Sequence, residues 1–149
     1  MAKLIYLGDV GHNSPEEGVF FRDTRLVLRA VPNSNMAEWL EYVGEKGRRR
    51  LLARAINANA YFEAGAPGKL AQVLELLDRG DPDVWEFRGT HKGARAPHLR
   101  MLGLFVGSVI TGGVFWAAIG LKKQNNQLRR TDIDSARKVM SEWRSQRRR

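Results

Sequence analysis

The chain has 149 residues, of which 43% are hydrophobic and 28% charged, a composition typical of one folded domain rather than of a disordered chain. It contains no cysteine, which excludes disulfide frameworks, thiolate zinc sites, iron–sulfur clusters and cysteine nucleophiles. The chain has only three histidines, which is few for a histidine-rich metal site, so we expect no metal ion and no cofactor. The apolar run at the N-terminus is too short for a signal peptide and reaches Asp9, which favours a cytoplasmic location.

The net charge of +9 is concentrated near the C-terminal end. Residues 122–149 carry ten lysines and arginines against three acids, whereas residues 1–121 are nearly neutral. A localised basic segment suits the phosphate backbone of a nucleic acid, and its binding is salt-sensitive. We therefore expect a nucleic acid or an acidic protein as partner. The alternative, a solvated tail, is the interpretation we favour for residues 147–149 alone.

The first half of the chain predicts short strands followed by helices. Residues 4–7 are an apolar run, and residues 24–31 alternate between polar and apolar side chains, as in a half-buried strand. The period then changes to that of helices, over residues 36–44 and again over 46–64. Two consecutive helices with a short glycine-containing join suggest an antiparallel hairpin. A third short helix is predicted over residues 70–77.

The second half contains a long uncharged stretch that allows two interpretations. Residues 84–88 predict a strand, and a polar loop follows at 89–97. Residues 101–121 contain no charged side chain and are long enough for a membrane span. Read as strands, residues 98–106 and 113–121 flank a glycine-containing turn, and their β-branched and aromatic residues favour this buried hairpin. We predict the hairpin and expect no membrane partner.

The final element is an amphipathic helix. Thr131 and Asp134 resemble a capping box. One apolar face follows, made by Ile133, Ala136, Val139, Met140 and Trp143. The predicted fold is therefore α+β, a small antiparallel sheet with an N-terminal helical hairpin packed on it and a basic C-terminal helix. It forms a single domain over residues 1–149, with an extra N-terminal segment at 1–23 and a basic C-terminal segment at 122–149.

Three stretches carry a resemblance to a known family. They are Val84-Trp85-Glu86-Phe87-Arg88, then Leu99-Arg100-Met101-Leu102-Gly103-Leu104-Phe105, then Gly120-Leu121-Lys122-Lys123 continuing into residues 131–137. In their order and spacing the chain resembles the RelE/ParE superfamily of toxins, within its HigB-like or phage-derived branch. The likeness covers residues 84–140 well and residues 24–80 only in the order of elements.

The resemblance implies the toxin of a type II toxin–antitoxin module, a ribosome-dependent mRNA endonuclease whose partners are a cognate antitoxin, mRNA and the ribosome. It implies a metal-independent reaction in which the ribose 2′-hydroxyl attacks the scissile phosphate. That chemistry needs a base, an acid and positive charge at the phosphate. The candidate catalytic residues are Arg100, His91, His98 and Arg95. The candidate RNA-binding residues are Arg88, Lys92, Lys122, Lys123, Arg129, Arg130 and Arg137.

Alternatives to this interpretation remain open. Many relatives have a histidine just before the glycine matched by Gly120, where this chain has Ala118-Ile119. Catalysis would then fall to the loop histidines and arginines, or the protein would bind a target such as DNA gyrase without cutting RNA. The structural alternative for Arg100 is an ion pair with Glu86 across the sheet. A third alternative is a single-span membrane protein with a basic cytoplasmic tail.

Overall fold

The computed structural model describes residues 7–9, 18–91, 93–95, 97–125 and 127–147. In chain order the elements are β1 (Gly8–Asp9), β2 (Val19–Arg22), β3 (Leu26–Ala30), α1 (Met36–Tyr42), α2 (Gly44–Glu63), α3 (Pro67–Leu70), β4 (Leu74–Asp78), β5 (Val84–Arg88), β6 (His98–Ser108), β7 (Gly112–Lys123) and α4 (Arg130–Arg147). Of the strand predicted at residues 4–7, all but Leu7 lies outside the described residues.

The strands form one mixed sheet of seven in the order β1-β2-β3-β7-β6-β5-β4. The pairs β1–β2 and β3–β7 are parallel, and the other neighbouring pairs are antiparallel. The prediction of an antiparallel sheet is therefore wrong. A parallel pair needs a long crossover connection, and here the chain between β3 and β7 includes all the helices except α4.

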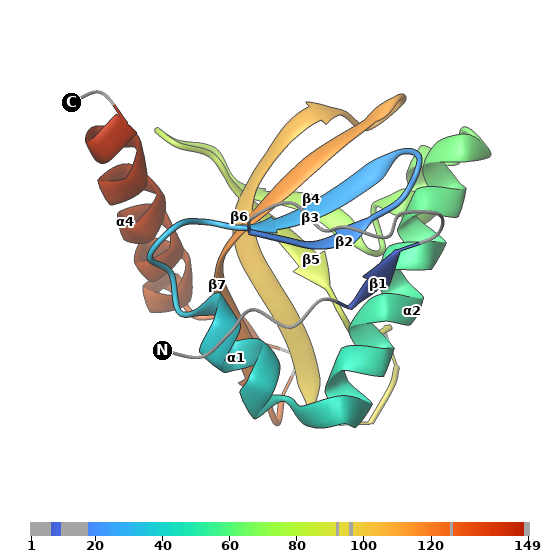
Figure 1. The fold of residues 1–149 in the computed structure, drawn as a ribbon, viewed down its shortest axis with the longest axis horizontal. Coiled ribbons are helices and arrows are strands. Elements are labelled where there is room, and N and C mark those ends of the chain that lie inside the picture. The colour runs from blue at the N-terminus through green and yellow to red at the C-terminus, as the bar shows by residue number, and fades with distance from the viewer. Residues whose placement is uncertain (1–6, 10–17, 92, 96, 126, 148–149) are drawn as a thin grey trace.

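Helices cover both faces of the sheet. Figure 1 shows α2 on one side of the strands and α4 on the other. On the α2 face, the predicted apolar stripe of this helix is confirmed, because Leu51, Ala55, Ala58 and Phe62 are buried. On the α4 face, Ala136, Met140 and Trp143 pack in a second cluster with the side chains of Val84, Leu102 and Ala118. The two clusters together make the core.

The predicted N-terminal helical hairpin is also wrong. The strands β1, β2 and β3 precede the helices, and Val43 is the single residue between α1 and α2. Gly44 follows with φ +75°, a backbone conformation that glycine adopts readily, and there the chain changes direction. Figure 1 shows the two helices meeting at this junction and diverging from it. Trp39 of α1 lies against β7, where a Cβ on Gly120 would meet the indole ring at 2.0 Å.

Other elements differ in extent or kind from their prediction. The helix predicted at residues 70–77 is wrong, because Leu74–Asp78 forms β4 and pairs with β5. A short leucine-rich run has no decisive period, and the open edge of β5 offers it hydrogen-bonding partners. The hairpin of β6 and β7 is confirmed. No helix in the described part of the chain is long and apolar enough to cross a membrane.

The C-terminal helix is confirmed, with a different cap from the predicted one. The Asp132 carboxylate accepts a hydrogen bond from the Arg129 backbone N–H at 3.0 Å, just ahead of the first turn of α4. This is the acidic half of a capping box, moved two residues from the predicted Asp134. At the other end of the molecule, Asn59 Oδ1 accepts hydrogen bonds from the N–H groups of Arg25 and Leu26, which fastens α2 to β3.

Candidate nucleic-acid interface

On the α4 face of the sheet, a fully buried carboxylate lies between two arginines. Glu86 of β5 is 0% exposed and forms ion pairs of 2.6 Å with Arg100 of β6 and with Arg88. The predicted alternative for Arg100, an ion pair with Glu86, is thereby confirmed. A buried charge is tolerated only when it is paired, so both guanidinium groups are needed to stabilise the buried carboxylate of Glu86. A catalytic role for Arg100 stays a prediction.

The basic C-terminal segment is likewise paired with acids of this chain. Arg137 lies 2.5 Å and Arg130 3.1 Å from the Asp78 carboxylate at the end of β4. The ammonium group of Lys123 lies 2.7 Å from Asp132. Three of the predicted RNA-binding residues therefore hold α4 on the sheet.

These contacts change the pKa values of the two carboxyl groups. Hydrogen bonds from Arg137 and Arg130 hold the pKa of Asp78 below its ordinary value, and they outweigh the opposing effect of desolvation. For Asp132, burial raises the pKa, but hydrogen bonds from Lys123 and from the Arg129 backbone outweigh it, so the pKa is lowered overall. Both acids are therefore fully charged partners of the basic segment at neutral pH.

On the opposite face, two neighbouring cavities follow one side of α2. The first, of about 300 Å³, is lined by Lys46, Arg50 and Lys122 among others. The second, of about 250 Å³, is lined by Arg50, Arg54 and His91 among others. Arg50 borders both. We call this pair of cavities, with the five basic side chains just named, the α2 groove. Among the described residues, no aspartate or glutamate lines either cavity.

The sequence of α2 explains the position of the groove. Lys46, Arg50 and Arg54 follow one another at intervals of four residues, so they lie on one side of the helix. Two glycines allow close packing around α2, Gly47 at its junction with α1 and Gly89 where the helix meets the end of β5. A Cβ on Gly47 would lie 2.8 Å from the Val43 Cβ, and one on Gly89 would lie 2.4 Å from a Leu51 methyl group.

Three cations of the α2 groove, Lys46, Arg50 and Arg54, have no acidic partner among the described residues. Among the described residues, Lys46 and Arg50 form no ion pair and no side-chain hydrogen bond. Arg54 donates to the backbone carbonyls of Gln72 at 3.1 Å and Arg88 at 3.3 Å. Burial lowers the pKa of Arg54, and the neighbouring Arg88 lowers it further against an opposing effect of Tyr61. An anion in the groove would relieve this concentration of positive charge.

The structure divides the predicted site residues between the two faces. His91 is exposed and lines the α2 groove, as does Lys122, whose ammonium lies 5.0 Å from the centre of the Tyr42 ring. Arg95 is exposed in the β5–β6 loop, and Lys92 lies outside the described residues.

The rest of the predicted set lies elsewhere. His98 begins β6 and pairs in register with Lys123, and Arg129 is exposed before α4. The sequence interpretation missed Lys46, Arg50 and Arg54 as binding residues. The signal that could have found them is their regular spacing away from the apolar stripe of α2.

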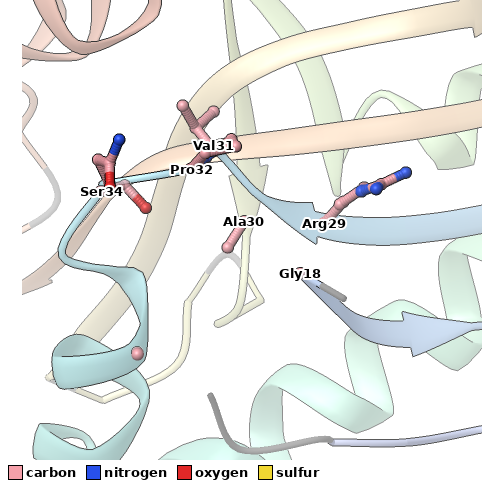
Figure 2. A pocket seen from close by; sticks show the side chains of 8 residues that line it. Gly18, Arg29, Ala30, Val31, Pro32 and Ser34 are labelled. Carbon is pink, nitrogen blue, oxygen red and sulfur yellow. The ribbon is translucent and has the colours of Figure 1, made fainter. Parts of the chain in front are cut away.

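A larger hollow of about 410 Å³ lies elsewhere, where β3 leads into α1. Figure 2 shows that its labelled lining is mostly small and apolar, and that the Arg29 side chain points away from Ser34. The guanidinium of Arg29 lies over the Trp116 ring, 4.7 Å from its centre. In the part of the chain that is described, no three histidine, aspartate or glutamate side chains gather in a way that could hold a metal ion.

Comparisons of the chain with protein-family models, with curated proteins and with solved structures find no match. The chemistry of the α2 groove is therefore the basis for inferring what this protein binds. Its lysines and arginines suit a polyanion, and His91 adds one imidazole beside Arg50 and Arg54. An imidazole near guanidinium groups can transfer a proton at a bound phosphate.

Proposed function

We propose that this protein binds RNA in the α2 groove and acts as the toxin of a type II toxin–antitoxin module that cleaves mRNA on the ribosome. The observation that carries the RNA-binding part is a groove lined by five basic side chains and, among the described residues, by no carboxylate. The toxin part is supported by the resemblance of residues 84–140 to the RelE/ParE superfamily. The expected location is the cytoplasm, and the expected partners are the ribosome and a cognate antitoxin.

The composition of the groove suits the phosphates of a nucleic acid. Arg50 carries a planar guanidinium group, which can match the oxygens of a phosphate with two parallel hydrogen bonds, and Arg54 adds a second guanidinium charge beside it. Lys46 and Lys122 add point charges at the other end. A row of such charges releases counterions from a nucleic acid on binding, so the affinity of the groove for RNA depends on salt.

The proposed cleavage uses this chain's own groups. The ribose 2′-oxygen attacks the adjacent phosphorus and the bond to the 5′-oxygen breaks, which leaves a 2′,3′-cyclic phosphate and a 5′-hydroxyl group. Arg50 and Arg54 stabilise the charge that develops on the phosphate oxygens. His91 takes the proton from the 2′-hydroxyl and returns it to the leaving 5′-oxygen.

The experiment is induction of the chain alone in bacteria, followed by an assay of mRNA cleavage on translating ribosomes. We expect growth arrest with the wild type and normal growth with His91→Ala, which should still bind RNA with its affinity unchanged within about twofold. The matched control is Arg49→Ala, because Arg49 is an exposed arginine of the same helix paired with Glu45. Normal growth at confirmed soluble expression of the wild type would remove the toxin proposal.

A second candidate function is a toxin that binds its target without cutting RNA, such as an inhibitor of DNA gyrase. Two observations favour it. Arg100, the strand arginine matched to the family, is held by buried Glu86, and of the histidines in the described part of the chain only His91 lines the groove. Growth arrest without mRNA cleavage, together with inhibition of gyrase supercoiling, would select this candidate.

A further inference from the structure

An exposed aromatic ring stands at the lysine end of the α2 groove. Tyr42, the last residue of α1, is 67% exposed, and no other aromatic side chain of the described residues lies mainly in solvent. The ammonium of Lys122 lies 5.0 Å from the centre of its ring, and Lys122 also lines the first cavity with Lys46. The ring therefore adjoins the groove and contributes little to the core.

We infer that the α2 groove takes a single strand of nucleic acid, with successive phosphates on Lys46, Arg50 and Arg54 and an unpaired base stacked on Tyr42. The inference rests on the proposed RNA-binding function and deepens it by naming the form of the substrate. Proteins that bind single strands combine a positively charged groove with aromatic platforms for the bases. Both parts are present here, at adjoining positions.

The geometry favours a single strand over a duplex. Side chains four residues apart on a helix begin about 6 Å from one another, a spacing that suits consecutive phosphates of an extended strand. The two cavities, of about 300 and 250 Å³, follow each other along α2 and are suited to a chain of nucleotides rather than to a cylinder. In a duplex the base faces are already stacked on their neighbours, so no base is available to Tyr42.

The Tyr42 ring also distinguishes binding of RNA from binding of an acidic protein segment. An acidic peptide would satisfy Lys46, Arg50 and Lys122 through its carboxylates but would gain no stacking. The Lys122 ammonium near the ring holds the tyrosine by a cation–π contact and adds positive charge next to the stacked base. Dependence on the ring itself is therefore the property to test.

The test measures binding of the full chain to a labelled single-stranded oligouridine and to an RNA duplex of equal length, by fluorescence anisotropy. We expect Tyr42→Ala to weaken binding of the single strand about tenfold or more, and Tyr42→Phe to retain it. Duplex binding should be weaker and the same for all three proteins. The control is Ile110→Ala, a side chain that is 72% exposed in the turn between β6 and β7.

Salt dependence checks the number of phosphate contacts. For a single strand held by the four cations Lys46, Arg50, Arg54 and Lys122, the logarithm of the binding constant should fall with the logarithm of salt concentration with a slope of about −3. Thermal unfolding of each variant checks that the substitution leaves the fold intact. Tyr42→Phe keeps the inference testable should Tyr42→Ala prove unstable, because loss of single-strand binding by the phenylalanine variant would contradict stacking.

The outcomes separate the inference from the proposed function. RNA binding that is equal in Tyr42→Ala and wild type, or equal for single strand and duplex, would overturn the single-strand inference and leave RNA binding in place. No RNA binding by the wild type would overturn the proposed function itself. Binding of polyglutamate with the affinity of the RNA, unaffected by Tyr42→Ala, would assign the groove to an acidic protein segment and overturn the inference.

Discussion

The two faces of the sheet both carry basic side chains and use them differently. On the α4 face, Arg100 contacts buried Glu86, and Arg137 contacts Asp78. On the α2 face, Lys46 and Arg50 line cavities to which no described residue contributes a carboxylate. A count of basic residues therefore does not locate a binding surface. The surface is located by basic residues that have no acidic partner within the fold. Charges already paired within the fold add little attraction for a phosphate backbone.

The basic C-terminal segment illustrates this point. Residues 122–149 are strongly basic in the sequence, yet acids of β4 and of the turn that follows it form ion pairs with α4 in the fold. Asp78 forms ion pairs with both Arg130 and Arg137, and Asp81 forms an ion pair with Arg144. The charge excess of the segment is thus partly cancelled in space by residues more than forty positions away.

The largest expected effect is a loss of stability when the buried ion pairs on the α4 face are removed. Glu86→Ala removes the buried carboxylate that pairs with Arg100 and with Arg88, and we expect it to lower the free energy of unfolding by about 3–5 kcal/mol. Urea unfolding measures the change. Glu45→Ala is the control, because the exposed Glu45–Arg49 pair should contribute less than about 1 kcal/mol. A similar small change in both variants would show that the buried pair is not what holds this face.

The next effect places a carboxylate in the α2 groove. Arg50→Glu removes a charged hydrogen bond to phosphate and adds repulsion, so the affinity for RNA should fall about ten- to a hundredfold. Stability should change by less than about 0.5 kcal/mol, since Arg50 forms no ion pair or side-chain hydrogen bond with the described residues. Arg49→Glu on the same helix is the matched control. If the two variants bind RNA equally well, the groove is not the RNA-binding surface.

A smaller effect compares two neighbouring lysines that point to opposite faces. Lys122 lines the α2 groove, whereas Lys123 pairs with Asp132 of α4. Lys122→Ala should weaken RNA binding and make the salt slope less steep by about 0.7. Lys123→Ala should leave that slope unchanged and lower the melting temperature instead. The reverse result would move the binding surface to the α4 face.

The smallest effect is a pH dependence on the α4 face. The pKa of Asp78 is lower in the folded protein than its ordinary value of 3.8, because Arg137 and Arg130 donate hydrogen bonds to the carboxylate. Its contribution to stability is therefore present above that value and is lost as the pH falls through the lower folded pKa. Asp78→Asn should melt at a lower temperature than wild type at neutral pH, with the difference shrinking as the pH falls below about 4. Glu142→Gln, at an exposed position of α4, is the control and should show no such convergence.

Elements with a strong local pattern were predictable from the sequence. The strand at residues 84–88, the hairpin of β6 and β7, and the amphipathic α4 all follow from periodicity and from β-branched or aromatic residues. The antiparallel sheet with an N-terminal helical hairpin was wrong, because the parallel pairing of β3 with β7 joins segments that are distant in the chain. No local period records such a pairing.

The candidate site divides in the same way. The apolar stripe of α2 and the regular row of basic residues beside it follow from the sequence alone, since both are properties of helical spacing. Which basic residues form ion pairs within the protein, and which are left available to a ligand, depends on the tertiary structure. Strand order brings Asp78 to Arg137, 59 residues away, and the crossover places Lys122 beside Tyr42 at the end of the α2 groove. Ion pairing depends on distance in space, and the folded chain sets that distance independently of separation in sequence.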